Sequence, residues 1–267
     1  MQTDLVLSPF GTRGGEALAA ARAADAGGFD VLWTYDHFGG AVVGAPWSRH
    51  PFVTLGAVAA VTERIGLGVL VANASNRHPA QLASAINTLQ SLAPGRVCCG
   101  VGSGTAATSP FAVEQHAIGR TPASAAVRRE HLRETIACLR AIWNNQPYHG
   151  AWMRADPPIG VVDGAPIPPI IVGGGSEAIV RLAAAVADGV NLIDGPQLGA
   201  LVGLARELTA DRPFDVSVFT DLDAEHRTGG DRQRYQALGI DRRTLAASAP
   251  YPVEAIAAIG ARLAQER

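Results

Sequence analysis

The segment spanning residues 65–104 constrains the fold more than any other, because a strand, a helix and a second strand follow one another within it. Residues 65–72 (IGLGVLVA) form an almost wholly apolar run, which is typical of a parallel strand covered on both faces. Pro79 can open the next segment as a helix, in which apolar residues recur at helical spacing. Residues 96–101 predict a second buried strand that runs into a glycine cluster, so the segment is a βαβ unit.

Similar strand-like runs recur along the chain, with helical patterns between them. They cover residues 4–9, 29–35, 65–72, 96–101, 169–172, 189–194, 214–220 and 240–246. Eight such units in about 250 residues predict an α/β fold, the (β/α)8 TIM barrel. We expect one such domain over residues 1–267. A doubly wound open sheet is the alternative, but neither glycine cluster spells the dinucleotide fingerprint G-x-G-x-x-G followed by an acidic residue.

Two stretches interrupt this alternation. Residues 105–124, after the fourth strand, are rich in Ala, Thr, Ser and Pro and are too long for an ordinary connection, so they predict a substrate-side loop. Residues 145–168, before the fifth strand, contain five prolines and several turn signals. They predict an inserted hairpin or loop.

The charge of the chain argues against several classes of partner and reaction. A net charge of −2 gives no basic field for nucleic acid or an anionic membrane. All 22 basic residues are Arg, so neither a lysine Schiff base nor a Walker-type phosphate lysine is available.

Three cysteines without metal-ligand spacing indicate small buried residues in a reducing compartment. The N-terminus has no basic region of the kind that opens a signal peptide, and no apolar run reaches the ~20 residues of a membrane span. We therefore expect a cytoplasmic protein.

Polar residues at the strand ends are the first candidates for chemistry, since all strand ends of a barrel point to one mouth. They are Phe10, Asp36, His37, Asn73, Ser103, Thr105, Gly173, Gly174, Gly175, Ser176 and Asp194. The pair Asp36 and His37 is the best catalytic candidate, because an imidazole can exchange a proton near neutral pH while the adjacent carboxylate sets its tautomer. The alternative is that both residues only cap the following loop.

The glycine run before the helix at residues 176–187 predicts an anion site, because bare N–H groups at a helix N-terminus bind phosphate. Ser176 is a good N-cap, and Arg77 could add charge. A tight turn without a ligand is equally compatible with the run.

Other chemistries find little support. The seven histidines include neither H-x-H nor H-E-x-x-H, so no metal site is expected. Gly102-Ser103-Gly104 lacks the frame of a serine nucleophile elbow.

Several segments resemble the bacterial-luciferase-like oxidoreductases, in the order that the family has them. They are residues 28–38 (GFDVLWTYDHF), residues 62–104, the PYHG turn at residues 147–150, and residues 168–192. The resemblance implies a (β/α)8 barrel that binds the deazaflavin coenzyme F420 or reduced FMN at its mouth.

The resemblance also implies roles for individual residues. Asp36 and His37 match the Asp-His pair that lies beside the reactive ring in the F420-using branch. Gly68 and Val69 match the place where the family has a non-proline cis peptide against the cofactor. Asn73, at a strand end, is a further cofactor-binding candidate. The others form two loops: the ring loop Gly102, Ser103, Gly104 and Thr105, and the phosphate loop Gly173, Gly174, Gly175 and Ser176.

Two departures from the family pattern bear on the substrate. The glucose-6-phosphate dehydrogenases of the family place a Glu as proton donor where this chain has Thr105, which argues against sugar-phosphate oxidation. Their Trp shortly after the Asp-His pair has no equivalent at the same spacing, since Trp47 lies several residues later.

We thus expect an F420-dependent oxidoreductase that moves a hydride to or from a small organic substrate, with His37 exchanging the proton. An FMN-dependent monooxygenase and a non-catalytic flavin-binding protein are the alternatives. The lack of an NAD fingerprint implies a separate enzyme that reduces the cofactor, and the resemblance implies a homodimer.

Overall fold

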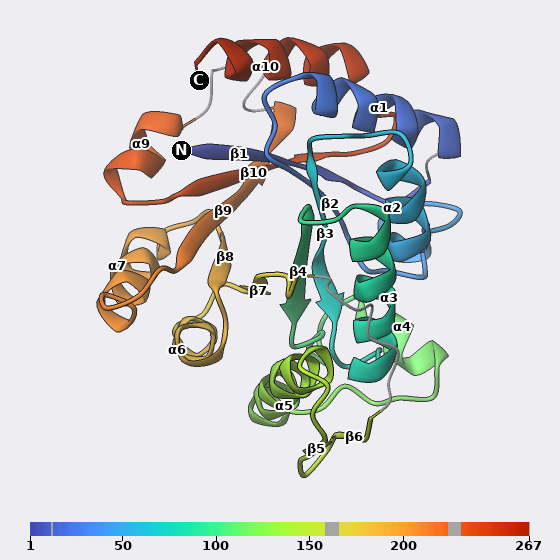
Figure 1. The fold of residues 1–267 in the computed structure, drawn as a ribbon, viewed down its shortest axis with the longest axis vertical. Coiled ribbons are helices and arrows are strands. Elements are labelled where there is room, and N and C mark those ends of the chain that lie inside the picture. Colours follow the sequence, from blue (N-terminus) through green and yellow to red (C-terminus); the bar gives the residue numbers. More distant parts are fainter. Residues whose placement is uncertain (12, 158–165, 224–230, 267) are drawn as a thin grey trace.

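A computed structural model describes residues 1–11, 13–157, 166–223 and 231–266 (Figure 1). Within them, eight parallel strands close a barrel in the order β1-β10-β9-β8-β7-β4-β3-β2. The strands are β1 (Gln2–Leu7), β2 (Val31–Thr34), β3 (Gly66–Asn73), β4 (Val97–Gly102), β7 (Ile170–Gly173), β8 (Gly189–Ile193), β9 (Asp215–Asp221) and β10 (Arg242–Ala247). The predicted (β/α)8 barrel is confirmed.

Helices surround the barrel, and α1 packs beside α10, so that the first and last helices close the ring (Figure 1). Besides α4, which is described below, the α-helices of the described residues are α1 (Gly14–Ala26), α2 (Pro51–Ala59), α3 (Pro79–Leu92), α5 (Ala125–Trp143), α6 (Glu177–Val186), α7 (Leu198–Leu208), α9 (Arg232–Ala237) and α10 (Val253–Gln265). None of the helices in the described ranges is long and apolar enough to cross a membrane.

The strands are buried on both faces, as their apolar runs predict. Side chains such as Leu67 and Val69 pack outward under the helices, whereas Trp33, Leu70 and Ile171 fill the barrel interior. The alternation follows from the two-residue repeat of a strand, which sends successive side chains to opposite faces.

The two interruptions fold as short inserted elements. Residues 105–124 contain a one-and-a-half-turn helix, α4 (Ala112–Ala117), in a stretch for which the composition predicts only a loop. The second interruption forms the antiparallel pair β5 (Tyr148–His149) and β6 (Arg154–Ala155), which confirms the predicted hairpin. The rest of that prediction, at residues 158–165, lies outside the described residues.

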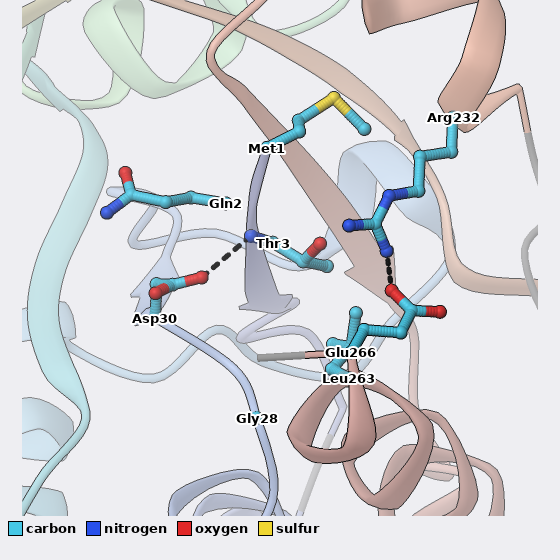
Figure 2. Close-up of a pocket in the computed structure, with 8 residues that line it drawn as sticks. All are labelled: Met1, Gln2, Thr3, Gly28, Asp30, Arg232, Leu263 and Glu266. Carbon is cyan, nitrogen blue, oxygen red and sulfur yellow. Dashed lines mark hydrogen bonds and ion pairs between the residues drawn. The ribbon is translucent and has the colours of Figure 1, made fainter.

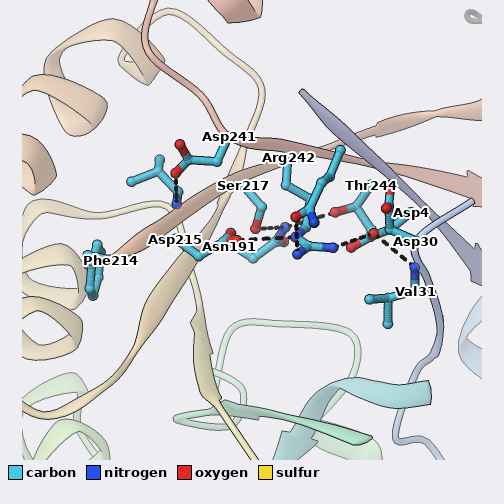
Figure 3. Close-up of polar contacts among 12 residues, drawn as sticks. Asp4, Asp30, Val31, Asn191, Phe214, Asp215, Ser217, Asp241, Arg242 and Thr244 are labelled. Carbon is cyan, nitrogen blue, oxygen red and sulfur yellow. Dashed lines mark hydrogen bonds and ion pairs between the residues drawn. The ribbon is translucent and has the colours of Figure 1, made fainter. Parts of the chain in front are cut away.

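A buried ionic network fills the amino end of the barrel (Figure 3). Arg242 lies between two carboxylates: its Nη1 donates to Asp4 at 2.6 Å and its Nε to Asp215 at 3.3 Å. Asp4 is fully buried and also accepts from Trp33 Nε1 at 2.8 Å and from the Val31 amide at 3.2 Å. Burial raises the pKa of Asp4 to about 7, against the opposing pull of Arg242. This network ties the first strand of the chain to the last.

Replacing Arg242 with Leu should lower the free energy of unfolding by about 3–5 kcal/mol, because it leaves the buried Asp4 carboxylate without its cation. The loss should be larger at pH 8 than at pH 5. A carboxyl whose pKa is raised on folding binds its proton more tightly in the folded state, so stability falls as pH rises from about 4 through that pKa. Urea unfolding at both pH values measures the effect, and the exposed Arg181→Leu serves as control. Equal losses at the two pH values would contradict the assignment.

Candidate active site

A cavity of about 510 Å³ opens at the carboxyl ends of the strands. Most of the site residues that the sequence predicts line it: Asp36, His37, Asn73, Gly102, Ser103, Gly104, Thr105, Gly173 and Gly174. Its size lies within the range of small-molecule and cofactor sites, and parallel barrels keep their chemistry at this end.

The prediction for Gly68 and Val69 is wrong. The non-proline cis peptide joins Leu70 to Val71, two residues later, where the register of β3 against β4 shifts. Gly68 faces the barrel interior, where a Cβ atom would lie 2.4 Å from the Trp33 ring. Val69 packs outward under the helices. Leu70 and Val71 therefore take the places in the cavity wall that were predicted for this pair.

Val71 lies between two glycines of neighbouring strands. A Cβ atom on Gly102 would come within 2.4 Å of the Val71 side chain, and one on Gly173 within 2.6 Å. Gly104, at the end of the same loop as Gly102, has φ +79°, which favours glycine. The two strand-end glycines therefore make room for the Val71 side chain, which lies in the cavity wall.

Gly175 and Ser176 lie outside the cavity lining, at its exposed rim. Ser176 is the N-cap of α6, and its Oγ accepts the Ile179 amide at 3.4 Å. The first turn of α6 thus begins beside Gly173 and Gly174, as the prediction of a glycine loop before a helix requires.

Asp36 is held in place by three hydrogen bonds. Arg77 donates to both carboxylate oxygens at 2.7 Å, and the Asn73 amide donates to Oδ2 at 3.0 Å. The side chain of Asp36 is only 2% exposed. Arg77 therefore neutralises Asp36. The sequence predicts that Arg77 adds charge to the phosphate loop, but in the structure its charge is paired with Asp36. The pair ties the end of β2 to the loop after β3.

His37 is held by a carboxylate that the sequence analysis missed. Its Nδ1 lies 2.9 Å from Oε2 of Glu114, a residue of α4 that is 4% exposed. The other oxygen of Glu114 accepts the amides of Phe38 at 3.2 Å and Gly39 at 3.0 Å. A carboxylate only accepts hydrogen bonds, so the contact with Glu114 places the proton of the neutral His37 ring on Nδ1 and leaves Nε2 unprotonated.

Aromatic rings surround the imidazole. The ring centroids of Phe10 and Phe111 lie 5.2 and 4.6 Å from that of His37. Tyr35 approaches edge-on at 6.4 Å. This apolar setting strengthens the hydrogen bond to Glu114 and limits the orientations open to the ring.

The remaining candidates divide between the cavity and its surroundings. Thr105 lines the cavity. Trp47 is 49% exposed and is not among the lining residues. Asp194 pairs instead with Arg234, at 2.9 and 3.0 Å, and with the Tyr235 hydroxyl at 2.8 Å.

A separate cavity of about 310 Å³ lies at the opposite, amino end of the barrel (Figure 2). Its polar side chains are already paired: Asp30 accepts the Thr3 amide at 2.8 Å, and Arg232 forms an ion pair with Glu266. We assign this cavity to the scaffold.

A model of the luciferase-like monooxygenase family matches residues 5–218. Among curated relatives, an F420-dependent glucose-6-phosphate dehydrogenase from Beutenbergia cavernae is 34% identical over 65% of this chain and 51% of its own length. A second enzyme of the same name, from Nakamurella multipartita, is covered to 49%, so the chain spans about half the length of these curated relatives.

Solved structures share the fold across nearly the whole chain. An F420-dependent secondary alcohol dehydrogenase, in complex with an F420-acetone adduct, superposes with a TM-score of 0.77 at 18% identity, covering 96% of this chain and 97% of its own. The oxygenating constituent of 3,6-diketocamphane monooxygenase from Pseudomonas putida, in complex with FMN, gives a TM-score of 0.73 at 17% identity, covering 100% and 98%.

Proposed function

The chain belongs to the luciferase-like monooxygenase family, and from this premise we propose that it is an oxidoreductase that moves a hydride between coenzyme F420 and a small organic substrate. The F420-dependent relatives named above support the choice of cofactor. The observation that carries the proposal is the Glu114–His37 pair in the cavity lining, in which Nδ1 holds the proton and Nε2 stays unprotonated.

The residues of the cavity fit a phosphorylated tricyclic cofactor. Gly102 and Gly173 make room for the Val71 side chain in the cavity wall, and a flat ring would stack against that side chain. The N-terminus of α6 would hold the phosphate through backbone amides, as suits a chain without lysine. Bound F420 supplies a ring carbon that accepts or gives up a hydride.

The role proposed for His37 is to move the proton that accompanies the hydride. With Nδ1 donating to Glu114, Nε2 is the atom that takes a proton from a substrate hydroxyl or returns it to a carbonyl. The negative charge of Glu114 stabilises the imidazolium that forms. Asp36, which is held by Arg77, would fix the loop on which His37 lies and help to orient the ring.

An FMN-dependent monooxygenase is the second candidate, because FMN occupies a neighbour of the same fold. A titration separates the two. Purified protein is mixed with F420 and with FMN, each oxidised and reduced, while absorbance and fluorescence are followed. Riboflavin, which lacks the phosphate, is the control for the α6 loop.

We expect F420 to bind more tightly than FMN, and FMN more tightly than riboflavin. Preference for FMN would favour oxygen-dependent chemistry. Binding of neither cofactor would overturn the proposal together with the roles of Asp36, His37 and the glycine loops.

Three further proposals complete this reading. A separate enzyme would reduce or reoxidise the cofactor, since the chain has no NAD fingerprint. The protein would act as a homodimer, as the family resemblance implies, and its cysteine pattern suits the cytoplasm.

A further inference from the structure

A third cavity, of about 390 Å³, lies on the flank of the barrel and has a basic lining. We call it the flank pocket. Its walls come from the loop after β3, the segment that follows α4, helix α5 and the β5–β6 hairpin. The lining includes Arg77, His78, Gln115, Arg120, His131 and Trp152, and it contains no acidic side chain.

Arg120 gives the pocket an uncompensated positive charge. It donates to the carbonyl oxygen of Ser75, and it forms no ion pair with any residue in the described part of the chain. His78 accepts the Ala80 amide at Nδ1, at 3.2 Å, so its proton lies on Nε2 as a further donor.

Two buried polar groups of the lining lack partners within the described ranges. Gln115 is 2% exposed, and its Oε1 makes no hydrogen bond. Nε2 of His131 is likewise buried without a partner, and its ring meets Trp152 edge-on at 4.4 Å. Unmet buried polar groups carry a free-energy cost, which a bound ligand removes.

The flank pocket is separate from the active site but adjoins it. Consecutive residues of α4 face the two cavities: Glu114 lines the active site, and Gln115 lines the flank pocket. Arg77 lines the flank pocket while it binds Asp36 of the active site.

We propose that the flank pocket binds a small hydroxylated oxyanion, of the size and charge of a glycerol phosphate. Arg120, His78 and His131 would donate to the anionic oxygens. Gln115 would accept from a hydroxyl, and Trp152 would cover the carbon chain. The site lies apart from the cofactor cavity, so the inference does not rest on the proposed function.

Titrations with glycerol 3-phosphate, inorganic phosphate and uncharged glycerol test the proposal, with Trp152 fluorescence as the signal. The variant Trp152→Phe assigns that signal, and calorimetry repeats the titration on protein saturated with its cofactor. We expect saturable one-to-one binding of glycerol 3-phosphate, weaker binding of inorganic phosphate and none of glycerol.

Two variants should weaken glycerol 3-phosphate binding at least tenfold: Arg120→Gln and, independently, His131→Asn. Gln115→Leu should remove the preference for glycerol 3-phosphate over inorganic phosphate. Arg133→Gln, on the same helix as His131 but outside the pocket lining, should change nothing. Thermal melts confirm that each variant is folded.

Three results would overturn the proposal. The first is the absence of saturation with either anion. The second is binding that folded Arg120→Gln and His131→Asn variants leave unchanged. The third is competition with the cofactor together with loss of anion binding in Ser176→Ala, which would place the anion in the α6 loop instead.

Discussion

Replacing His37 with Asn should lower kcat by ~10²–10⁴-fold while the affinity for the cofactor changes little. Asn can still donate a hydrogen bond to Glu114, so the loop keeps its anchor, but it cannot take up a proton near neutral pH. The measurement is kcat on a substrate found by screening alcohols, carbonyl compounds and enones with the bound cofactor. The dissociation constant of the cofactor is measured in parallel.

His116 provides the matched control, because it is an exposed histidine on the same short helix as Glu114. His116→Asn should retain the activity of the unmodified protein. Full activity of His37→Asn would remove His37 from the proton transfer. Loss of cofactor binding in that variant would instead assign the histidine a structural role.

The barrel was predictable because its determinants are local and repeat along the chain. Each strand is an apolar run, and most of the helices between the strands have apolar residues at helical spacing. Asp36 and His37 were predictable for the same reason, since consecutive polar residues at the end of an apolar strand fall at the barrel mouth.

Glu114 was not predictable in this way. Its contact with His37 spans 77 residues and depends on how a long connection folds back over the mouth. The one available signal was a single carboxylate directly after the apolar residues 111–113, in a stretch for which a loop was expected. The six residues of α4 are too few to show a clear helical period.

The error at Gly68 and Val69 has a related cause. Where a strand bulges depends on how it pairs with its neighbour, and the shift between Val69 and Ala72 is visible only once β3 lies against β4. Both residues are buried, so hydropathy alone could not place one against Trp33 and the other under the helices.

Replacing Glu114 with Gln should lower kcat by ~10–10³-fold by reversing the tautomer of His37. The amides of Phe38 and Gly39 both point at Oε1, so the Gln carbonyl oxygen stays there and its NH₂ group faces Nδ1. Nδ1 then has to accept, which moves the proton to Nε2, the atom that has to act as base. The variant also loses the charge that stabilises the imidazolium.

Nitrogen-15 chemical shifts of the His37 ring separate this role from a merely structural one. The unmodified protein should show the proton on Nδ1, and Glu114→Gln should show it on Nε2, with an unchanged melting temperature as evidence that the loop is intact. Glu130→Gln, at an exposed position of α5, should alter neither the tautomer nor the rate. If the rate falls while the proton stays on Nδ1, Glu114 acts by holding the Phe38–Gly39 backbone, and its assigned role in setting the tautomer of His37 is wrong.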